Sequence, residues 1–239
     1  MTEQSTSITA QRPGSGEMFD RIARRYDLLN RLMSLGLDRG WRKQLTASLE
    51  TGPLNRVLDL ATGTGDVAIS IARCYPHVGV VGLDPSSGML GVAEEKVRSL
   101  KLSSQIELVK GDAQSLPYEN DSFDSVAISF GIRNVPDRAL ALSEMVRVTR
   151  KGGTVSILEL NEPGGGLLGR LAQIHVHHIV PRLGAVLSGA KEYRYLQRSI
   201  AAFPPPDKFA EMMGEAGLLD LNTRKFLFGV ACLFTGKKR

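Results

Sequence analysis

Short apolar runs alternate with amphipathic stretches along the central part of the chain. The apolar runs are rich in valine, isoleucine and leucine, as buried strands are, and the stretches between them carry apolar residues at helical spacing. Strands are predicted at 56–61, 78–84, 106–112, 123–130 and 153–160, and helices at 66–75, 87–100 and 138–150. Strands separated by helices of about ten to fifteen residues indicate βαβ units and a parallel sheet. Because the strands are apolar almost throughout, helices should cover both faces, which predicts a doubly wound α/β fold.

The segments that flank this pattern differ from it. Residues 1–17 are polar and predict a disordered tail, whereas 18–50 carry an amphipathic pattern that predicts a helical cap. The stretch 163–200 has no strand signal and predicts a helical lid inserted into the fold. A further helix is predicted at 204–217, followed by two strands that form an antiparallel hairpin at the sheet edge. We therefore expect one domain over 18–239, with a seven-stranded, mostly parallel sheet.

Composition and charge narrow the class of protein. The 30 basic and 25 acidic residues give a net charge of +5, spread along the chain, which favours a solvated surface over nucleic-acid binding. The same positive charge leaves weak binding to anionic lipid headgroups as an alternative. The sequence is also compatible with a homodimer. The chain has no signal-peptide pattern and no apolar run of roughly 20 residues, so we expect a cytoplasmic protein, with peripheral contact at the inner face of the membrane left open. The two cysteines, Cys74 and Cys232, lie in apolar contexts and are expected to be buried and reduced.

The turn after the first predicted strand has the chemistry of a nucleotide-binding loop. Gly63, Thr64 and Gly65 open a helix, and Asp84 follows about 20 residues later at the end of the second strand. Glycines allow the backbone to approach a ligand closely, and a carboxylate at this strand end accepts hydrogen bonds from ribose hydroxyls. The pattern fits both NAD and S-adenosylmethionine.

Further polar positions favour S-adenosylmethionine. Asp59 lies inside the first strand, where a buried carboxylate needs a polar or cationic partner such as the ammonium group of a methionine moiety. Asp112 ends the third strand, where it is placed to accept the amino group of adenine beside Ala113, and Ser129 ends the fourth strand. One elongated ligand would touch all of these strand ends. The predicted cofactor-binding residues are Gly63, Thr64, Gly65, Asp84, Asp112, Ala113 and Ser129.

Several sequence segments resemble those of a known enzyme family. The segments "LDLATGTGD", "GLDPSSGML", "GDAQSLP" and "FDSVAISFGIRNVPD" together resemble class I S-adenosylmethionine-dependent methyltransferases. The segments "FDRIARRYDLLNRLMSLGLDRGW", "ISFGIRN", "YRYLQRSIAAFP" and "FGVACLFTGKK" are similar to the menaquinone/ubiquinone C-methyltransferases, and Asp38 stands where that family usually has His. The resemblance implies a Rossmann-like sheet and C-methylation of a reduced polyprenyl quinone precursor, most simply demethylmenaquinol. The benzoquinol of the ubiquinone pathway is the alternative or second substrate.

The implied reaction needs a nucleophilic ring carbon, which a quinol offers and an electron-poor quinone does not. Ligands bind at the carboxyl ends of such strands, and the loop after the fourth strand carries Arg133 and Asn134. Arg133 stays protonated and suits a fixed cation beside a developing phenolate, with a structural ion pair to Asp137 or Glu159 as the alternative. Asn134 is predicted to orient the same oxygen. Tyr26, in the predicted cap, is expected to complete the site, with core packing as its alternative.

A histidine cluster, His175, His177 and His178, raises the question of a metal. Its spacing does not place three imidazoles on one helical face, and no cysteine or carboxylate cluster accompanies it, so no metal is predicted. His178 matches a family position and is either a pocket base or a surface residue. The apolar stretch around the cluster suits an isoprenoid tail and peripheral membrane contact. Two other classes stay open: an NAD-dependent reductase and a non-catalytic S-adenosylmethionine-binding partner in a quinone-synthesis complex.

Overall fold

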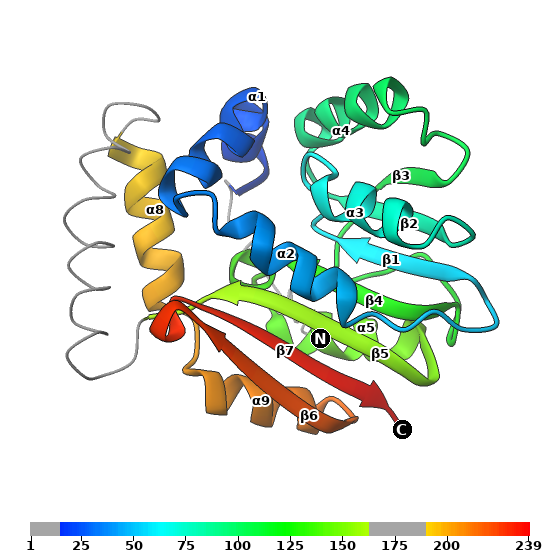
Figure 1. Ribbon diagram of the computed structural model, residues 1–239. Helices are drawn as coiled ribbons and strands as arrows, with labels where there is room; N and C mark the ends of the chain where they lie inside the picture. The colour runs from blue at the N-terminus through cyan, green and yellow to red at the C-terminus, as the bar shows by residue number, and fades with distance from the viewer. Residues whose placement is uncertain (1–14, 163–189) are drawn as a thin grey trace, which may run out of the picture.

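A seven-stranded sheet in the order β3-β2-β1-β4-β5-β7-β6 forms the centre of the fold. The computed structural model describes residues 15–162 and 190–239, and Figure 1 shows the sheet among its helices. The strands are β1 (Arg56–Leu60), β2 (Gly79–Asp84), β3 (Ile106–Lys110), β4 (Phe123–Ser129), β5 (Thr149–Leu160), β6 (Leu218–Phe226) and β7 (Ala231–Lys238). The first five pair in parallel, whereas β7 runs antiparallel to both β5 and β6. The predicted mostly parallel sheet with an antiparallel C-terminal hairpin is confirmed.

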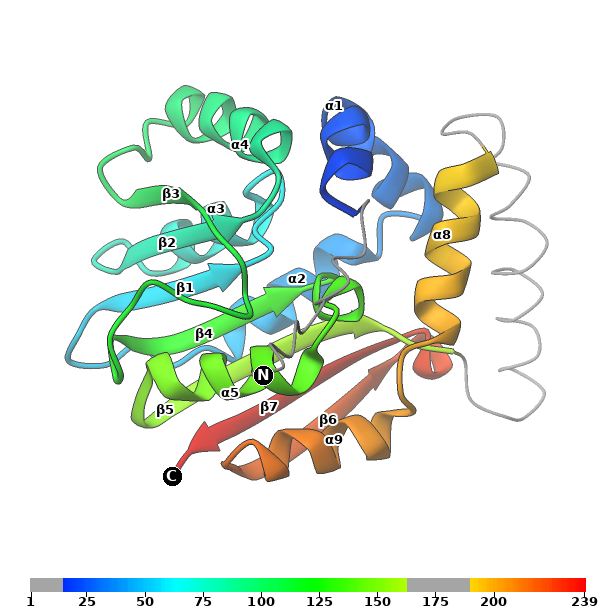
Figure 2. The same ribbon diagram turned by 180° about the vertical axis from the view of Figure 1, so that it is seen from behind.

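Helices cover both faces of the sheet, as the apolar strands predict. One face carries α2 (Asp38–Ala47), α3 (Asp66–Cys74) and α4 (Ser87–Ser99), and the other carries α5 (Arg138–Val148) and α9 (Pro206–Glu215). Figures 1 and 2 view the sheet from opposite sides, with α2 and α3 in front in one and α5 and α9 in front in the other. The strand order reverses between β1 and β4, which is where an open α/β sheet of this kind binds its ligands.

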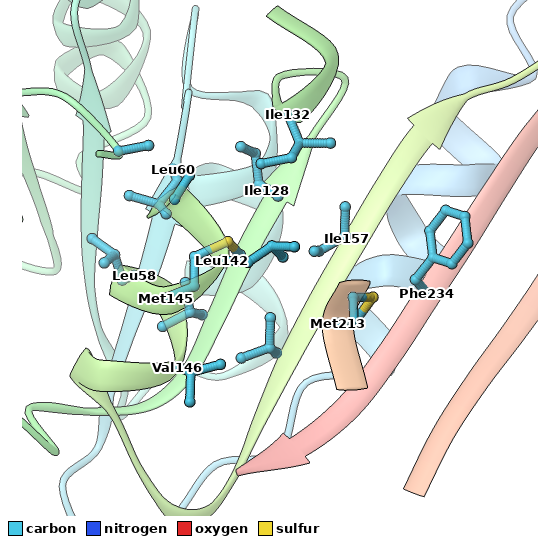
Figure 3. Packing of buried hydrophobic residues seen from close by; sticks show 14 of the residues in the cluster. Leu58, Leu60, Ile128, Ile132, Leu142, Met145, Val146, Ile157, Met213 and Phe234 are labelled. Atoms are coloured by element: carbon cyan, nitrogen blue, oxygen red, sulfur yellow. The ribbon is translucent and has the colours of Figure 1, made fainter. Parts of the chain in front are cut away.

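Alternation along the strands divides the core between the two faces. In β1, Leu58 and Leu60 belong to the cluster with α5 and α9, whereas Val57 belongs to the cluster with α2 and α3. Figure 3 shows the first cluster, in which Leu142 of α5 packs against strand residues such as Ile128. All five side chains are fully buried, so each contributes the free energy of removing its apolar surface from water. The sheet is thereby a fixed platform for the loops at its edge.

Two helices lie beyond the carboxyl ends of the parallel strands. These are α1 (Ser15–Met33) and α8 (Ala190–Ala201), and both views place them on the side of the strand arrowheads (Figures 1 and 2). The predicted cap thus consists of α1 and α2, and α1 already begins inside the stretch 1–17 that was predicted to be disordered. Of the predicted lid, α8 is described, while 163–189 lies outside the described residues, as do the three histidines.

Two local expectations were wrong. Cys74 is exposed because it is the last residue of α3, whereas Cys232 is buried in β7 as expected. Strand β5 begins at Thr149 rather than at 153, and Thr149 pairs with Phe123 of β4. The early start is held by an ion pair of 2.7 Å between Arg150 and the fully buried Asp124.

Candidate active site

A cavity of about 200 Å³ opens at the carboxyl ends of the central strands. Its wall combines the loops after β1, β2, β3 and β4 with side chains from α1. Predicted site residues that line it are Tyr26, Gly63, Asp84, Asp112, Ala113 and Asn134. Loops far apart in the sequence therefore meet in one place, because the carboxyl ends of parallel strands share one edge of the sheet. Below, this space is called the cofactor cavity.

Gly63 and Gly65, in the turn after β1, are needed for different structural reasons. Gly63 has φ +57°, and a Cβ added to it would meet nothing closer than 3.9 Å, so this side of the backbone is open to a ligand. Gly65 has φ +82°, but a Cβ there would lie 3.2 Å from the Cβ of Ala93, so this glycine allows α3 and α4 to pack closely. Thr64 is buried and donates a hydrogen bond of 2.6 Å to Asp27. Thr64 and Gly65 shape the turn without lining the cavity.

Asp84 at the end of β2 presents a nearly buried carboxylate to the cofactor cavity. Its two oxygens accept hydrogen bonds from the backbone N–H groups of Gly63 and Ser86, each at 2.8 Å. Burial raises the pKa of Asp84, and the two N–H groups oppose this shift. Each carboxylate oxygen has a second lone pair for a further donor. The geometry suits the predicted role, in which ribose hydroxyls donate to this carboxylate.

The other three predicted polar residues, Asp112, Ser129 and Asp59, differ in how they are placed. Strand β3 ends at Lys110, so Asp112 lies two residues beyond the strand that it was predicted to end. Asp112 lines the cofactor cavity beside Ala113, and the backbone N–H and the side-chain amide of Gln114 hold its carboxylate. Ser129 does not line the cavity, and its buried hydroxyl makes no hydrogen bond within the described residues. Asp59 is also absent from the wall; Thr62 donates to it at 2.6 Å, and burial raises its pKa to about 7. Thr62 therefore binds one oxygen of Asp59, Oδ2, while the other oxygen, Oδ1, is buried and has no hydrogen-bond partner among the described residues.

Helix α1 closes one side of the cofactor cavity and is fixed by two carboxylates. Asp20 accepts hydrogen bonds from the hydroxyl of Ser86 at 2.5 Å and from the N–H of Gly88 at 2.8 Å, which lower its pKa. Asp27 pairs with Lys96 of α4 at 2.9 Å, one residue beyond Tyr26. Sequence reasoning missed Asp20 and Lys96 because their partners depend on how α1 docks. These contacts hold the Tyr26 ring in the cavity wall.

Helix α8 contributes a tyrosine that was not predicted. The Tyr195 hydroxyl donates a hydrogen bond of 3.1 Å to the Asn134 side-chain oxygen, and burial raises the pKa of Tyr195. Phe19 of α1 contacts the rings of both Tyr26 and Tyr195, with centroids 6.0 and 6.4 Å apart. The tyrosine fixes the Asn134 amide so that its nitrogen faces away from this bond. The only sequence signal for Tyr195 is its place in the segment "YRYLQRSIAAFP".

Arg133 lies in the wall of a second cavity, of about 90 Å³, which we call the apolar cavity. Its side chain is 7% exposed and pairs with the fully buried Glu159 at 2.5 Å. The same nitrogen, Nη1, donates to the Phe130 carbonyl at 2.7 Å, and the Arg133 backbone N–H donates to Glu159 at 3.1 Å. Of the two predicted partners, Glu159 forms the ion pair, because Asp137 instead caps α5. The predicted structural ion pair is present, and it occupies one end of the guanidinium.

Neither a metal site nor a membrane span is found in the part of the chain that the structure describes. Within residues 15–162 and 190–239, no group of three His, Cys, Asp or Glu side chains is arranged to hold a metal ion. In the same residues, no helix combines the length and the apolar character needed to cross a bilayer.

Comparison with known proteins identifies the family. Residues 6–238 match the family model described as the ubiE/COQ5 methyltransferase family. The chain belongs to this family. A demethylmenaquinone methyltransferase of Deinococcus radiodurans is 45% identical over 93% of this chain and 92% of its own length. A ubiquinone/menaquinone biosynthesis C-methyltransferase UbiE of Syntrophotalea carbinolica is 43% identical over 94% of this chain and 95% of its own length.

Solved structures show the same fold at low sequence identity. A structure of a putative S-adenosylmethionine-dependent methyltransferase from Methanococcus maripaludis matches with a TM-score of 0.68 and 16% identity, covering 100% of this chain and 97% of that one. A possible histamine N-methyltransferase from Thermotoga maritima matches with a TM-score of 0.63 and 19% identity, covering 94% of this chain and 99% of that one. At these identities the likeness concerns the Rossmann-like fold alone.

Membership of the ubiE/COQ5 family makes the protein an S-adenosylmethionine-dependent methyltransferase. The alternative of an NAD-dependent reductase is thereby excluded. The cofactor cavity fits this cofactor: its wall has the open backbone of Gly63, the spare lone pairs of Asp84, and Asp112 beside Ala113. Thr64, Gly65 and Ser129 are not part of that wall, so direct cofactor contacts from these three stay predictions.

Proposed function

We propose that this methyltransferase transfers the S-adenosylmethionine methyl group to a ring carbon of demethylmenaquinol, forming menaquinol. The names of its relatives, a demethylmenaquinone methyltransferase and a ubiquinone/menaquinone biosynthesis C-methyltransferase, support a quinone-biosynthesis reaction. The observation that carries the proposal is the junction of two cavities. Phe130 lines both of them, and the consecutive residues Arg133 and Asn134 line one each. A cofactor cavity that carries the carboxylates of Asp84 and Asp112 thus adjoins a more apolar one, as transfer to a prenylated ring requires.

Bound S-adenosylmethionine supplies an electrophilic methyl group, and the protein must align a nucleophilic carbon with it. In a quinol, the hydroxyl next to the acceptor carbon pushes electron density onto that carbon, more so as it loses its proton. Tyr195 holds the oxygen of Asn134, which leaves the Asn134 amide nitrogen to donate to that quinol oxygen. Tyr26 closes the same wall from α1. Arg133, the residue before Asn134, adds a fixed positive charge on the side of the apolar cavity, which favours negative charge developing on the quinol ring.

The redox state of the acceptor tests this proposal. Labelled S-adenosylmethionine is incubated anaerobically with prenylated demethylnaphthoquinols, with the matching oxidised quinones, and with prenylated benzoquinols. We expect transfer to the reduced naphthoquinol and none to the oxidised quinone, because only the quinol carbon is nucleophilic. Equal transfer to the oxidised quinone would contradict the mechanism. Faster transfer to the benzoquinol would indicate that the enzyme acts in the ubiquinone pathway. Binding of S-adenosylmethionine without transfer to any acceptor would indicate a non-catalytic cofactor-binding protein.

Membrane contact and self-association are further proposals on the same substrate. A polyprenyl quinol is held in a bilayer, so we propose that the enzyme docks peripherally on the membrane to reach it. Co-sedimentation with anionic vesicles at low and high salt tests this contact, and light scattering tests the homodimer.

A further inference from the structure

The apolar cavity contains two buried hydrogen-bond donors that have no acceptor. The side-chain nitrogen Nδ2 of Asn30 and the guanidinium Nε of Arg133 are both buried, and neither makes a hydrogen bond within the described residues. Both residues line this cavity. Leaving a buried donor unpaired is costly, and most buried polar atoms in proteins are paired. Two such donors in one cavity therefore indicate that an acceptor oxygen binds there.

The other polar side chains of the same wall are already satisfied. Asp38 accepts a hydrogen bond from Ser34 at 2.7 Å and forms an ion pair with Arg42 at 3.1 Å. Asn161 accepts from the N–H of Glu162 at 2.9 Å and donates to the Pro204 carbonyl at 3.4 Å. The unmet requirement of the cavity is thus for an acceptor, which excludes a cation as the complementary ligand.

The rest of the wall is aromatic and aliphatic. The rings of Trp41 and Phe130 meet edge to face, with centroids 6.4 Å apart and an interplanar angle of 65°. The aliphatic side chains are those of Leu160, Leu196, Ile200 and Val230. Its volume of about 90 Å³ is less than the roughly 150 Å³ of an engineered cavity that holds benzene, so a fused two-ring quinol does not enter whole. One edge of such a ring and the start of its tail would enter, with the ring at Phe130, where the two cavities meet.

We propose that the apolar cavity binds the prenyl-bearing edge of the quinol substrate, a claim that rests on the proposed function. The quinol oxygen next to the prenyl-bearing carbon accepts hydrogen bonds from Asn30 Nδ2 and Arg133 Nε. The first isoprenoid unit packs against the aliphatic wall. The neighbouring unsubstituted carbon then faces the cofactor cavity. Arg133 can keep its ion pair in this arrangement, because Nη1 is held by Glu159 and Phe130 while Nε has no acceptor among the described residues.

Asn30 is the better residue for a test, since substituting Arg133 would break its buried ion pair. Asn30→Asp keeps the shape of the side chain and replaces the donor with an acceptor. The control is Asn222→Asp on the exposed face of β6, far along the chain from either cavity. Trp41 is the single tryptophan of the chain and lines the apolar cavity, so its fluorescence reports binding there without need of turnover.

Full-length protein is titrated anaerobically with 2-geranyl-1,4-naphthoquinol and, separately, with 2-geranylnaphthalene, which lacks both oxygens. For Asn30→Asp we expect the Kd of the quinol to rise by on the order of 10-fold, with an unchanged Kd for geranylnaphthalene and for S-adenosylmethionine. Asn222→Asp should match the wild type with all three ligands. An unchanged Kd for the quinol in Asn30→Asp would overturn the proposal and would mean that water, rather than the quinol, binds Asn30 Nδ2 and Arg133 Nε. If the wild type binds the quinol in this way but transfers no methyl group, the proposed function fails and the binding site stands.

Discussion

Removing the negative charge of Glu159 should destabilise the protein more than any surface charge change. Glu159 is fully buried and is the ionic partner of Arg133, whose side chain is 7% exposed. Glu159→Gln keeps the size of the side chain but leaves a buried guanidinium uncompensated, which costs about 3–5 kcal/mol. For a protein of this size each kcal/mol corresponds to about 2–4 °C, so the melting temperature should fall by roughly 6–20 °C. Both quantities are measured, by urea denaturation and by thermal scans.

Two further variants separate the ion pair from general damage to the core. Glu94→Gln breaks an exposed pair with Arg98, whose side chains are 68% and 70% exposed, and should cost at most about 1 kcal/mol. The double variant Arg133→Met with Glu159→Leu removes both charges and should recover most of the lost stability, because apolar residues often replace a buried pair without loss. A loss below about 1 kcal/mol in Glu159→Gln would refute the reasoning. So would a double variant that is less stable than the single one.

Two other predictions concern the acids of the first two strands. Asp84→Asn should weaken S-adenosylmethionine binding by about 1–3 kcal/mol, measured by isothermal titration, because the amide replaces one of the carboxylate oxygens that we assign to the ribose hydroxyls. The control Glu119→Gln changes an exposed residue and should bind the cofactor as the wild type does. An unchanged Kd for S-adenosylmethionine in a folded Asp84→Asn variant would contradict the assignment of the ribose to Asp84. Asp59 has a folded pKa of about 7 against an ordinary 3.8, so the folded state holds a proton that the unfolded state has lost. Stability should therefore fall as pH rises from about 4 to about 7, and Asp59→Asn should flatten that slope in urea denaturation; an identical slope in both proteins would contradict the raised pKa.

The fold could be predicted because its signals are local. Apolar runs such as the one around Leu58, and the glycine turn at Gly63, specify strands and the turn between strand and helix within a few residues. The cofactor wall followed from a geometric rule, since parallel strands bring their carboxyl ends together. That rule placed Asp84 and Asp112 correctly in one cavity.

The remainder of the site depends on how helices dock, which no local pattern encodes. The contact between Tyr195 and Asn134 spans 61 positions, and the one between Asp20 and Ser86 spans 66. The sequence left the partner of Arg133 open, and only the packing of β5 beside the loop after β4 selects Glu159. Ser129 shows the limit of the strand-end rule: it ends β4 as predicted, yet it does not line the cofactor cavity.

The position of the transferred methyl group tests the central claim most directly. Reduced, geranylated demethylmenaquinol carrying deuterium on the unsubstituted ring carbon is incubated with S-adenosylmethionine, and the product is analysed by mass spectrometry. The account predicts a product that gains one methyl group and loses the deuterium, because the new bond forms at that carbon. A methylated product that retains the deuterium would place the methyl group on oxygen and contradict the account.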